Sequence, residues 1–496
     1  MHTSFLKRAP LFALSLFITL FSFGQPSPAM DTDEDMPKDY LPKEFHAGRR
    51  AALREAMPDN SVIVVMAYPT RTFSNDVEYK YHPNPDMYYF SGYKEPHSLL
   101  LVFKTEQTDS AGNKYSEILF VQKKNAAAEQ WTGKRLGLEG SKTKLGIAMS
   151  FNGEDFSNFS VDFSKFDKII FDRFPVDIPN GRDKADLYDL LQQFKQKAAI
   201  PEDYSKEKRF DNRSYREITA KLREIKTPEE MTLIRKAVEI SCQGQNEVMK
   251  AVRPDMSEME IQGLHEFVHK KYGAEGVGYG SIIGSGENGC TLHYEENTKT
   301  KIGSSMLLMD VGAEYHGYTA DVTRTIPAGG KFGEAEKVIY QLVYDAQEAA
   351  FKTLKDGSKW ADAEKAARDV ITDGLVRLGI AKDKAEANKY YPHGLGHHIG
   401  MDVHDRGTYS NLKKDMVITI EPGIYIPSNS NCEKKWWGIA VRIEDDARVT
   451  EDGYELLSHF APRKIEDIEK MISQKSALDD FKLPALKSAS PEKKAF

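Results

Sequence analysis

Three strand-like segments of this chain end in an acidic residue, and this pattern constrains the fold more than any other feature. Asp310 follows the apolar residues 306–309, and Glu421 and Glu444 each follow an isoleucine. Short apolar runs of this kind are typical of buried strands. A buried carboxylate is unfavourable unless it is paired or bound to a metal ion. The fold therefore has to supply these side chains with a positive partner.

A fourth acidic residue, Asp321, lies on the far side of a turn from Asp310. We expect a β-hairpin centred between Tyr315 and His316, in which Asp310 and Asp321 lie directly opposite each other. Directly opposed residues of antiparallel strands have Cβ atoms about 4.5–5.5 Å apart, and like charges there are destabilising. A cation between the two carboxylates would remove this repulsion.

Four histidines lie within the twelve residues that begin at His393, namely His393, His397, His398 and His404. Glycines beside them allow the backbone to approach a ligand closely and free the imidazoles from helix packing. A single histidine in such a segment would indicate a structural role. Four of them favour a binding site.

Together these segments supply two Asp, one His and two Glu, a donor set rich in oxygen. Such hard ligands suit manganese, with cobalt or iron as alternatives. Five side chains also exceed the three protein ligands that a catalytic zinc normally takes. The set therefore favours two metal ions about 3.5–4 Å apart, bridged by carboxylates and a hydroxide.

A second metal-binding pattern, H-E-x-x-H, occurs at His265-Glu266-Phe267-Val268-His269 on a predicted helix. The same helix carries an apolar face that we assign to Ile261, Leu264, Phe267 and Val268. We therefore expect both histidines to lie at the exposed edge of this face. We interpret the match as accidental and expect activity to survive replacement of His265.

The length of 496 residues exceeds one ordinary hydrophobic core and predicts two domains with terminal extensions. We place the domains at residues 43–210 and 211–471, with a flexible leader over 25–42 and a polar tail over 472–496. Strand-like and helix-like segments alternate in the first domain, which predicts an α/β structure. The net charge of -7 is distributed along the sequence without a basic stripe, so we expect no nucleic-acid partner.

Residues 1–24 have the pattern of a secretory signal peptide. Lys7 and Arg8 precede an apolar run, and Ser22-Phe23-Gly24 fits a small-x-small cleavage site. We expect cleavage before Gln25, a periplasmic or secreted protein, and no stable membrane span after processing. Three cysteines are too few for a disulfide framework.

The second domain begins with a strong helix start. Thr227 suits the N-cap, Pro228 the first helical position, and Glu230 completes a capping box. A second helix is expected to begin near Ser257.

Ordered motifs recur through both domains. In the second they are residues 284–290, His293-Tyr294, Asp310 with Gly312, residues 321–325, His393-Gly394 with His397, residues 402–405, 421–425 and 442–446. In the first they are residues 86–92, Glu95-Pro96 and residues 131–137. Over about residues 44 to 470 the chain resembles aminopeptidase P, a member of the pita-bread metallopeptidases.

The resemblance implies a mixed α/β (α+β) fold with an N-terminal α/β domain and a C-terminal pita-bread metallopeptidase domain. It also implies two divalent ions, Mn²⁺ or alternatively Co²⁺, Fe²⁺ or Zn²⁺. The implied ligands are Asp310, Asp321, His397, Glu421 and Glu444. Asp321 and Glu444 would bridge the two ions.

The resemblance further implies release of an N-terminal residue that precedes proline, through attack by a hydroxide held between the two ions. Glu421 would handle the proton of this hydroxide. His293, His393 and His404 would contact the substrate, and His404 or His293 would stabilise the oxyanion or protonate the leaving nitrogen. The remaining substrate-binding residues would be Tyr279, Tyr425 and Arg442, with Arg442 on the proline side.

Three alternatives remain open at this point. Prolidase, which cuts only X-Pro dipeptides, has both domains and the same metal ligands. Because fold alone does not fix function, creatinase-like chemistry without metal and a metal-free peptide-binding module on the same fold are also considered. The presence of all five ligand types argues against both. As partners we expect small peptides with an X-Pro N-terminus, and we expect a homo-oligomer.

Overall fold

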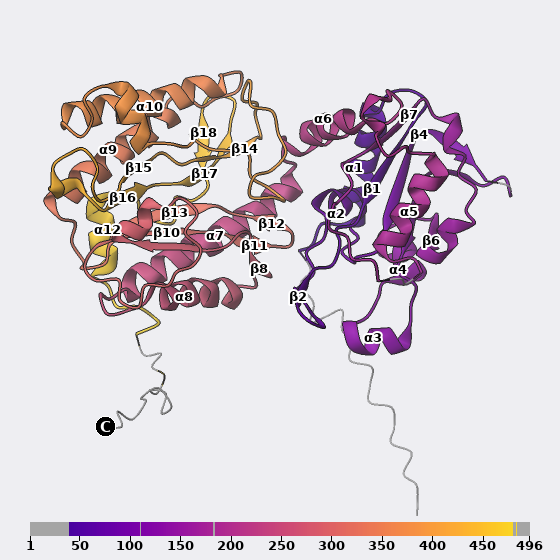
Figure 1. The fold of residues 1–496 in the computed structure, drawn as a ribbon, viewed down its shortest axis with the longest axis horizontal. Coiled ribbons are helices and arrows are strands. Elements are labelled where there is room, and N and C mark those ends of the chain that lie inside the picture. Colours follow the sequence, from indigo (N-terminus) through magenta and orange to yellow (C-terminus); the bar gives the residue numbers. More distant parts are fainter. Residues whose placement is uncertain (1–38, 110, 182–183, 480–482, 484–496) are drawn as a thin grey trace, which may run out of the picture. The chain divides into compact units, whose positions relative to one another are not determined.

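The computed structural model describes residues 39–109, 111–181, 184–479 and 483. The predicted signal peptide lies outside the described residues, as do most of the predicted leader and most of the predicted tail. Two halves with separate sheets follow each other along the described chain, in agreement with the predicted mixture of helices and strands (Figure 1).

A five-stranded mixed sheet forms the centre of the N-terminal half, with the strand order β6-β5-β4-β1-β7 (Figure 1). β1 runs antiparallel to β4 and parallel to β7. Val62 and Val64 of β1 belong to one hydrophobic cluster, and Ile63 and Val65 to another. Both faces of the sheet are therefore covered, which explains why this strand is a continuous apolar run.

The strands of this half are β1 (Ser61–Met66), β2 (Thr72–Ser74), β3 (Val77–Glu78), β4 (Leu99–Thr108), β5 (Lys114–Val121), β6 (Ser150–Asn152) and β7 (Lys168–Phe171). Its helices are α1 (Lys43–Ala56), α2 (Pro85–Ser91), α3 (Ala126–Thr132), α4 (Gly137–Thr143), α5 (Leu187–Ala198) and α6 (Asn212–Arg223).

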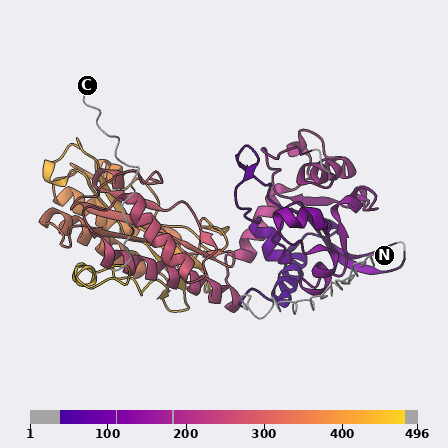
Figure 2. The same ribbon diagram turned by 90° about the horizontal axis from the view of Figure 1, so that it is seen from below.

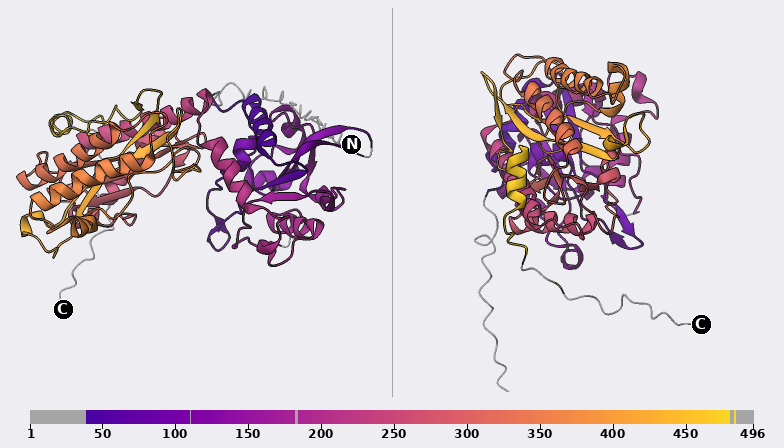
Figure 3. Two further views of the ribbon diagram at one scale, coloured as in Figure 1. Left: turned by 90° about the horizontal axis from the view of Figure 1, so that it is seen from above. Right: turned by 90° about the vertical axis from the view of Figure 1, so that its left-hand side faces the viewer.

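Two pairs of helices frame the C-terminal half. α7 (Pro228–Ala251) begins with the predicted capping box, in which the Thr227 N–H donates to the Glu230 carboxylate at 2.9 Å. It lies beside α8 (Glu258–Lys271), which begins next to Ser257 as predicted and has this serine as its N-cap (Figure 2). α9 (Glu334–Phe351) and α10 (Trp360–Arg377) form the second pair (Figure 3).

Short strands between and after these helices form small sheets with the orders β13-β10-β9, β12-β11-β8, β14-β17-β18 and β15-β16. They are β8 (Gly276–Val277), β9 (Ile282–Ser285), β10 (Met306–Val311), β11 (Ala313–Tyr315), β12 (Tyr318–Thr319), β13 (Val322–Pro327), β14 (Val417–Ile420), β15 (Gly423–Ile426), β16 (Ile439–Arg442), β17 (Asp445–Val449) and β18 (Tyr454–Leu456). The remaining helices are α11 (Lys384–Ala387) and α12 (Ile465–Ile472).

The hairpin that runs from β10 to β13 turns one residue later than predicted. Tyr315 pairs with Tyr318, so the hairpin is centred between His316 and Gly317. Both turn residues have positive φ, 50° for His316 and 82° for Gly317. A two-residue loop with both residues in the left-handed region is a type I′ turn, whose twist matches that of the flanking strands.

This shift changes the partner of Asp310. Asp310 pairs with Thr323, and Asp321 is its diagonal neighbour two residues away. The prediction that Asp310 and Asp321 are directly opposed is therefore wrong. Because side chains alternate with a period of two, both aspartates nevertheless point to the same face of the hairpin.

One hydrophobic cluster contains residues from both halves of the chain, among them Val65, Tyr89, Ile234 and Tyr318. All three cysteines are free, so hydrophobic packing rather than a disulfide framework holds the described fold. Among the described helices, none combines the length and the low polarity that crossing a bilayer requires.

Candidate metal centre and active site

The five predicted metal ligands come from separate positions that the strands of the C-terminal half bring to one place. Asp310 lies near the end of β10, and Asp321 directly precedes β13. Glu421 directly follows β14, and Glu444 lies between β16 and β17. His397 lies in an irregular segment that is hydrogen-bonded to β14.

Close approach of two backbone segments near these ligands requires glycine. A Cβ atom on Gly312 would lie 1.9 Å from the carbonyl oxygen of Ala320, and one on Gly396 would lie 2.0 Å from that of Thr419. Any side chain at either position would push the two segments apart. Gly312 therefore keeps Asp310 near Asp321, and Gly396 keeps the histidine segment against β14.

The ligand atoms lie within a few ångströms of one another. His397 Nε2 lies 3.5 Å from Asp321 Oδ2 and 3.4 Å from Glu421 Oε1. One ligand atom from each of Asp321, His397 and Glu444 can be chosen so that all three lie within 4.8 Å of one another. Four of the predicted ligands thus surround one small volume.

Tyr279 connects the fifth ligand to this group. Its hydroxyl oxygen lies 2.6 Å from Asp310 Oδ1 and also 2.6 Å from Asp321 Oδ1. Since a phenol has a single proton, it can donate to only one of the two carboxylates at a time. The structure therefore brings all five predicted ligands together, with Tyr279 between the two aspartates.

Burial and repulsion between carboxylates shift the pKa values of the cluster. Burial, reinforced by Asp321 and Asp310, raises the pKa of Glu421 to about 8. Burial and three neighbouring carboxylates raise the pKa of Glu444 well above its ordinary value. Burial lowers the pKa of His397, but the hydrogen bond and charge of Asp321 and the charge of Glu421 outweigh it and raise this pKa to about 9.

These shifts fit a site for divalent cations. The raised pKa values of Glu421 and Glu444, caused by burial and by neighbouring carboxylates, and that of His397, caused by Asp321 and Glu421, favour protonated forms, whereas a bound cation favours the deprotonated forms. Four carboxylates and one imidazole are the donors that oxygen-preferring divalent ions select. The residues present therefore fit a metal centre.

A cavity of about 520 Å³ is bordered by the five ligands. His293, His393 and His404, which the sequence predicts to contact substrate, also line it. The His404 ring packs edge-on against the His397 ring, with ring centroids 4.3 Å apart. The rest of the lining includes Ile282, Leu292, Glu295, Val403 and Tyr409. The cavity thus combines the metal-ligand cluster with an apolar wall.

Arg442 and Tyr425 make a hydrogen-bonded chain beside the cavity. The buried Arg442 guanidinium pairs with Asp310 through Nη2 and donates from Nη1 to the Tyr425 hydroxyl at 2.9 Å. His393 Nδ1 lies 2.9 Å from the Gly394 carbonyl oxygen and therefore carries the proton, which leaves Nε2 to accept from the Tyr425 hydroxyl at 2.9 Å. Tyr425 is absent from the cavity lining. The predicted substrate-binding pair thus orients His393 and Asp310, and only Arg442 reaches the cavity.

Three polar residues that the sequence prediction left without a role support the ligands. The hydrogen bonds run from Thr323 Oγ1 to Glu444 Oε2 at 2.6 Å, from Thr419 Oγ1 to Glu421 Oε1 at 3.3 Å, and from the Asp321 N–H to Asp446 Oδ2 at 3.1 Å. Each supporting residue lies two positions from a ligand along the chain. Residues two apart share one face of a strand, and this alternation is the sequence signal that could have identified them.

The loop that carries His293 is held by one buried carboxylate, that of Glu258 at the start of α8. Its oxygens accept hydrogen bonds from the Ser285 N–H at 2.8 Å, Asn288 Nδ2 at 3.0 Å, the Tyr294 hydroxyl at 2.9 Å and the Lys299 N–H at 2.9 Å. Donors from four residues on one carboxylate fix the loop against α8.

The two histidines of α8 are buried, so the prediction that they lie at an exposed edge is wrong. His265 is 0% exposed and His269 is 1% exposed, whereas Phe267 is 47% exposed. At about 100° per residue, Phe267 lies about 120° around the helix from the buried Ile261. His265 follows Ile261 by about one turn and therefore shares its side of the helix.

Gly244 of α7 makes room for both imidazoles. A Cβ atom on Gly244 would lie 2.9 Å from His269 Nε2 and 3.2 Å from His265 Nδ1. None of the four ring nitrogens has a hydrogen-bond partner among the residues that the structure describes. Burial lowers the pKa of His269 to about 4 and that of His265 well below its ordinary value. Both histidines are therefore neutral packing residues at neutral pH.

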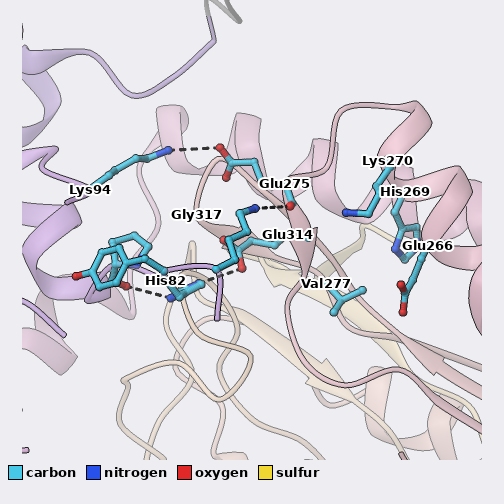
Figure 4. A pocket seen from close by; sticks show the side chains of 13 residues that line it. His82, Lys94, Glu266, His269, Lys270, Glu275, Val277, Glu314 and Gly317 are labelled. Carbon is cyan, nitrogen blue, oxygen red and sulfur yellow. Dashed lines mark hydrogen bonds and ion pairs between the residues drawn. The ribbon is translucent and has the colours of Figure 1, made fainter. Parts of the chain in front are cut away.

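A second cavity, of about 470 Å³, lies beside α8 and has His269, Glu266 and Lys270 in its lining (Figure 4). Across it, Lys94 forms an ion pair with Glu275 at 3.5 Å. None of the five predicted ligands lines this cavity. The H-E-x-x-H pattern therefore belongs to a different part of the molecule from the metal-ligand cluster.

Comparison with known proteins agrees with the fold. Residues 232–451 match metallopeptidase family M24, and residues 46–169 match the N-terminal domain of aminopeptidase P. The Xaa-Pro aminopeptidase of Escherichia coli strain K12 is 32% identical over 448 residues, which cover 86% of this chain and 96% of that protein. The chain belongs to the aminopeptidase P family. As a member of this family, it is a metallo-aminopeptidase.

Solved structures of aminopeptidase P have the same fold. Escherichia coli aminopeptidase P with the inhibitor Pro-Leu superposes with a TM-score of 0.76 at 30% identity, covering 87% of this chain and 98% of that one. A variant of the same enzyme in complex with substrate gives a TM-score of 0.76 at 31% identity and the same coverage. These aminopeptidase P structures confirm the predicted pairing of an N-terminal domain with a pita-bread metallopeptidase domain.

Proposed function

We propose that this metallo-aminopeptidase releases the N-terminal residue from peptides whose second residue is proline. The observation that carries the proposal is the convergence of five side chains on one cavity, Asp310, Asp321, His397, Glu421 and Glu444. The name of the Escherichia coli relative and the Pro-Leu inhibitor in the similar structure support the choice of proline.

The proposed cofactor is a pair of manganese ions held by these five side chains, because carboxylates outnumber the single imidazole. When bound, two divalent ions would supply Lewis-acid activation of a water molecule and of the scissile carbonyl. Metal-depleted protein reloaded with Mn²⁺, Co²⁺, Fe²⁺ or Zn²⁺ is expected to show the highest activity per bound ion with Mn²⁺. Higher activity with another ion would replace manganese in the proposal.

Glu421 is the proposed general base. Its Oε1 faces His397 at 3.4 Å and its Oε2 faces His393 Nδ1 at 3.8 Å. The side chain remains 17% exposed at the cavity wall, whereas that of Asp321 is 7% exposed. Glu421 can therefore reach a water molecule in the cavity and accept its proton during attack on the carbonyl that precedes proline.

His404 and His293 are the residues that we propose to act on the tetrahedral oxyanion and on the leaving nitrogen. When the bond before proline breaks, the leaving nitrogen keeps the electron pair and has to gain a proton from another group. Both histidines line the cavity, and both are exposed to it rather than packed in the core. One of them would hydrogen-bond the tetrahedral oxyanion, and one would protonate the leaving nitrogen.

Substrate length separates this proposal from the prolidase alternative, which the Xaa-Pro aminopeptidase relatives do not favour. Manganese-loaded protein is expected to release arginine from Arg-Pro-Pro and to leave Gly-Pro intact. Cleavage of Gly-Pro alone would instead indicate a prolidase. No release from any X-Pro peptide would contradict the proposed specificity.

We also propose that the protein is exported through its N-terminal sequence, which has the pattern of a signal peptide. Mass spectrometry of protein expressed with residues 1–24 is expected to find Gln25 at the new N-terminus. The homo-oligomer remains a prediction that light scattering of the purified protein can check.

A further inference from the structure

His404 lies in a segment without helix or strand, residues 401–408. Its ring nitrogens form no hydrogen bond with any residue that the structure describes, and its ring contacts that of His397. The side chain therefore takes its position from its own backbone segment. Whatever holds this segment also places His404 over the metal-ligand cluster.

Two aspartates on either side of His404 attach the segment to a single arginine. Arg223, the last residue of α6, donates from Nη2 to Asp402 Oδ2 at 2.7 Å and to Asp405 Oδ1. Arg223 is 1% exposed and Asp405 is 4% exposed. Lys226 Nζ donates to the second oxygen of Asp405 at 2.9 Å. The residues on both sides of His404 are thus tied to Arg223 and Lys226, at the end of α6 and just after it.

The N-terminal half contributes the third carboxylate of this network. Arg223 Nη1 donates to Oδ1 of Asp86, a 1% exposed residue of α2, at 2.8 Å. The other oxygen of Asp86 accepts from the Tyr215 hydroxyl at 3.0 Å and lies 3.3 Å from Arg406 Nη2. The Arg223 guanidinium is therefore fixed from one side by Asp86 and fixes the His404 segment on the other.

The charges in this network depend on one another. When one partner of a buried ion pair is removed, the charged side chain that remains is uncompensated, and it either moves or loses its charge. Without the fork of Arg223, Asp402 and Asp405 would both lose a buried cationic partner, and Lys226 would remain paired with Asp405. Other hydrogen bonds of the segment, such as those from the Asp405 N–H to the His398 carbonyl at 2.8 Å and from the Thr408 N–H to Glu224 at 2.9 Å, do not replace these two carboxylate contacts, so loss of the fork is expected to displace His404.

We propose that Arg223 is a positioning residue for the aminopeptidase reaction, and that Asp86 of the N-terminal half acts through it to hold His404 at the cavity. The inference rests on the proposed function, because it assumes that His404 acts on the X-Pro substrate. It assigns to the N-terminal half a part in the chemistry of a site whose ligands all come from the C-terminal half.

A double-substitution cycle on kcat tests this proposal. Arg223→Lys keeps the charge but removes the planar fork that contacts three carboxylates. In the otherwise native protein it is expected to lower kcat for an X-Pro tripeptide about 10- to 100-fold, because a displacement of about 1 Å can cost about 10²-fold. KM is expected to change less than about threefold. In a His404→Ala background the same substitution is expected to lower kcat less than about twofold, since groups that act as one unit are not additive.

Arg50→Lys is the matched control. Arg50 is also 1% exposed, and it donates to Glu117 at 2.9 Å and to the Phe90 carbonyl at 2.8 Å within the N-terminal half. It has no contact with residues 401–408 in the hydrogen bonds of the described chain. Its substitution is expected to lower the melting temperature and to leave kcat unchanged in both backgrounds.

Three outcomes would overturn the proposal. They are an unchanged kcat in Arg223→Lys, an equal fold-loss in both backgrounds, or a loss that follows a fall in bound metal measured by elemental analysis. If Arg223→Lys does not fold, Asp402→Asn takes its place, because Asp402 is 39% exposed and tolerates change more readily. A native protein inactive on every X-Pro peptide would contradict the proposed function instead, so the two failures are distinguishable.

Discussion

Two histidine-bearing regions of this protein differ in their sequence pattern and in the side chains that surround them. His265 and His269 of α8 lie one helical turn apart and match a known metal-binding pattern, yet both are neutral and buried, and neither belongs to the group of close metal-ligating side chains found among the described residues. His397 lies in an irregular segment, and its metal-ligand partners lie between 24 and 87 residues away in sequence. Among the residues that the structure describes, it is this second region whose acidic side chains and histidine lie close enough together to hold an ion. A contiguous pattern is therefore weaker evidence for chemistry than separate carboxylates that need a common partner.

The largest expected difference between the two regions is in activity. Asp321→Ala is expected to lower kcat/KM for an X-Pro tripeptide by about 10³-fold or more, as loss of an essential group does. His265→Ala is expected to retain activity per folded molecule, although it removes a buried ring and destabilises the fold by about 2–4 kcal/mol. Steady-state kinetics with active fractions measured by thermal unfolding would decide this. Comparable losses of activity in both variants would remove the distinction.

Metal removal is expected to separate the two regions by its effect on the free energy of unfolding. Chelation of the native protein is expected to lower the free energy of unfolding by about 2.7 kcal/mol for each ion that had been present at about 100 times its Kd. His265→Ala is expected to show the same change, because its metal-ligand cluster is intact. Asp321→Ala is expected to show a much smaller one. Calorimetric melting curves with and without chelator provide the measurement, and a His265→Ala protein insensitive to chelator would assign metal to α8.

Lowering the pH should destabilise the folded protein through the buried histidines of α8. Burial lowers the pKa of His269 from 6.5 to about 4, so the unfolded chain binds a proton near pH 6.5 that the folded protein takes up only near pH 4. Stability is therefore lost as pH falls through this window, and His269 accounts for about 1.4 kcal/mol between pH 8 and pH 5.5. Urea unfolding of His269→Leu should show a loss smaller by this amount than that of the native protein. An equal loss in both proteins would contradict the burial argument.

The smallest expected effect concerns Gly244, the residue of α7 that leaves room for His265 and His269. Gly244→Ala gains helix propensity, but its Cβ would lie 2.9 Å from His269 Nε2, so we expect a net destabilisation of about 1 kcal/mol. In a His269→Ala background the same change should become stabilising. Gly263→Ala is the control, because Gly263 lies in α8 with nothing within 4 Å of the position of a Cβ atom. Chemical denaturation of the four variants would show whether the sign reverses.

Much of the metal-ligand cluster could be predicted from the sequence because burying a carboxylate is so unfavourable. Glu421 and Glu444 stand out after strand-like runs, and that signal does not depend on knowing the strand register. The register itself could not be predicted. His316 takes a positive φ that a non-glycine residue adopts rarely, and this choice moved the turn by one residue and separated Asp310 from Asp321.

The burial of α8 could not be predicted for a different reason. When polar and apolar residues are mixed around a helix, the sequence does not fix which face of that helix is buried. The helix that packs against it determines this. In this protein Gly244, some twenty residues earlier in the chain, lacks a side chain and so leaves room for the two imidazoles of α8. The network of Arg223 with Asp86 and Asp405 was equally hidden, because its members are more than 130 residues apart and each is an ordinary charged residue by itself.

The anchoring of the His293 loop by Glu258 bears on attempts to retune this enzyme. Directed evolution that randomises the loop positions facing the cavity, Leu292 and Glu295 among them, would leave in place the four residues that donate to Glu258 and so keep the loop's path. A chance replacement of Glu258 would release the whole loop at once from outside the cavity. In a selection for altered peptide preference, such a variant would score as a change of selectivity although it touches no substrate.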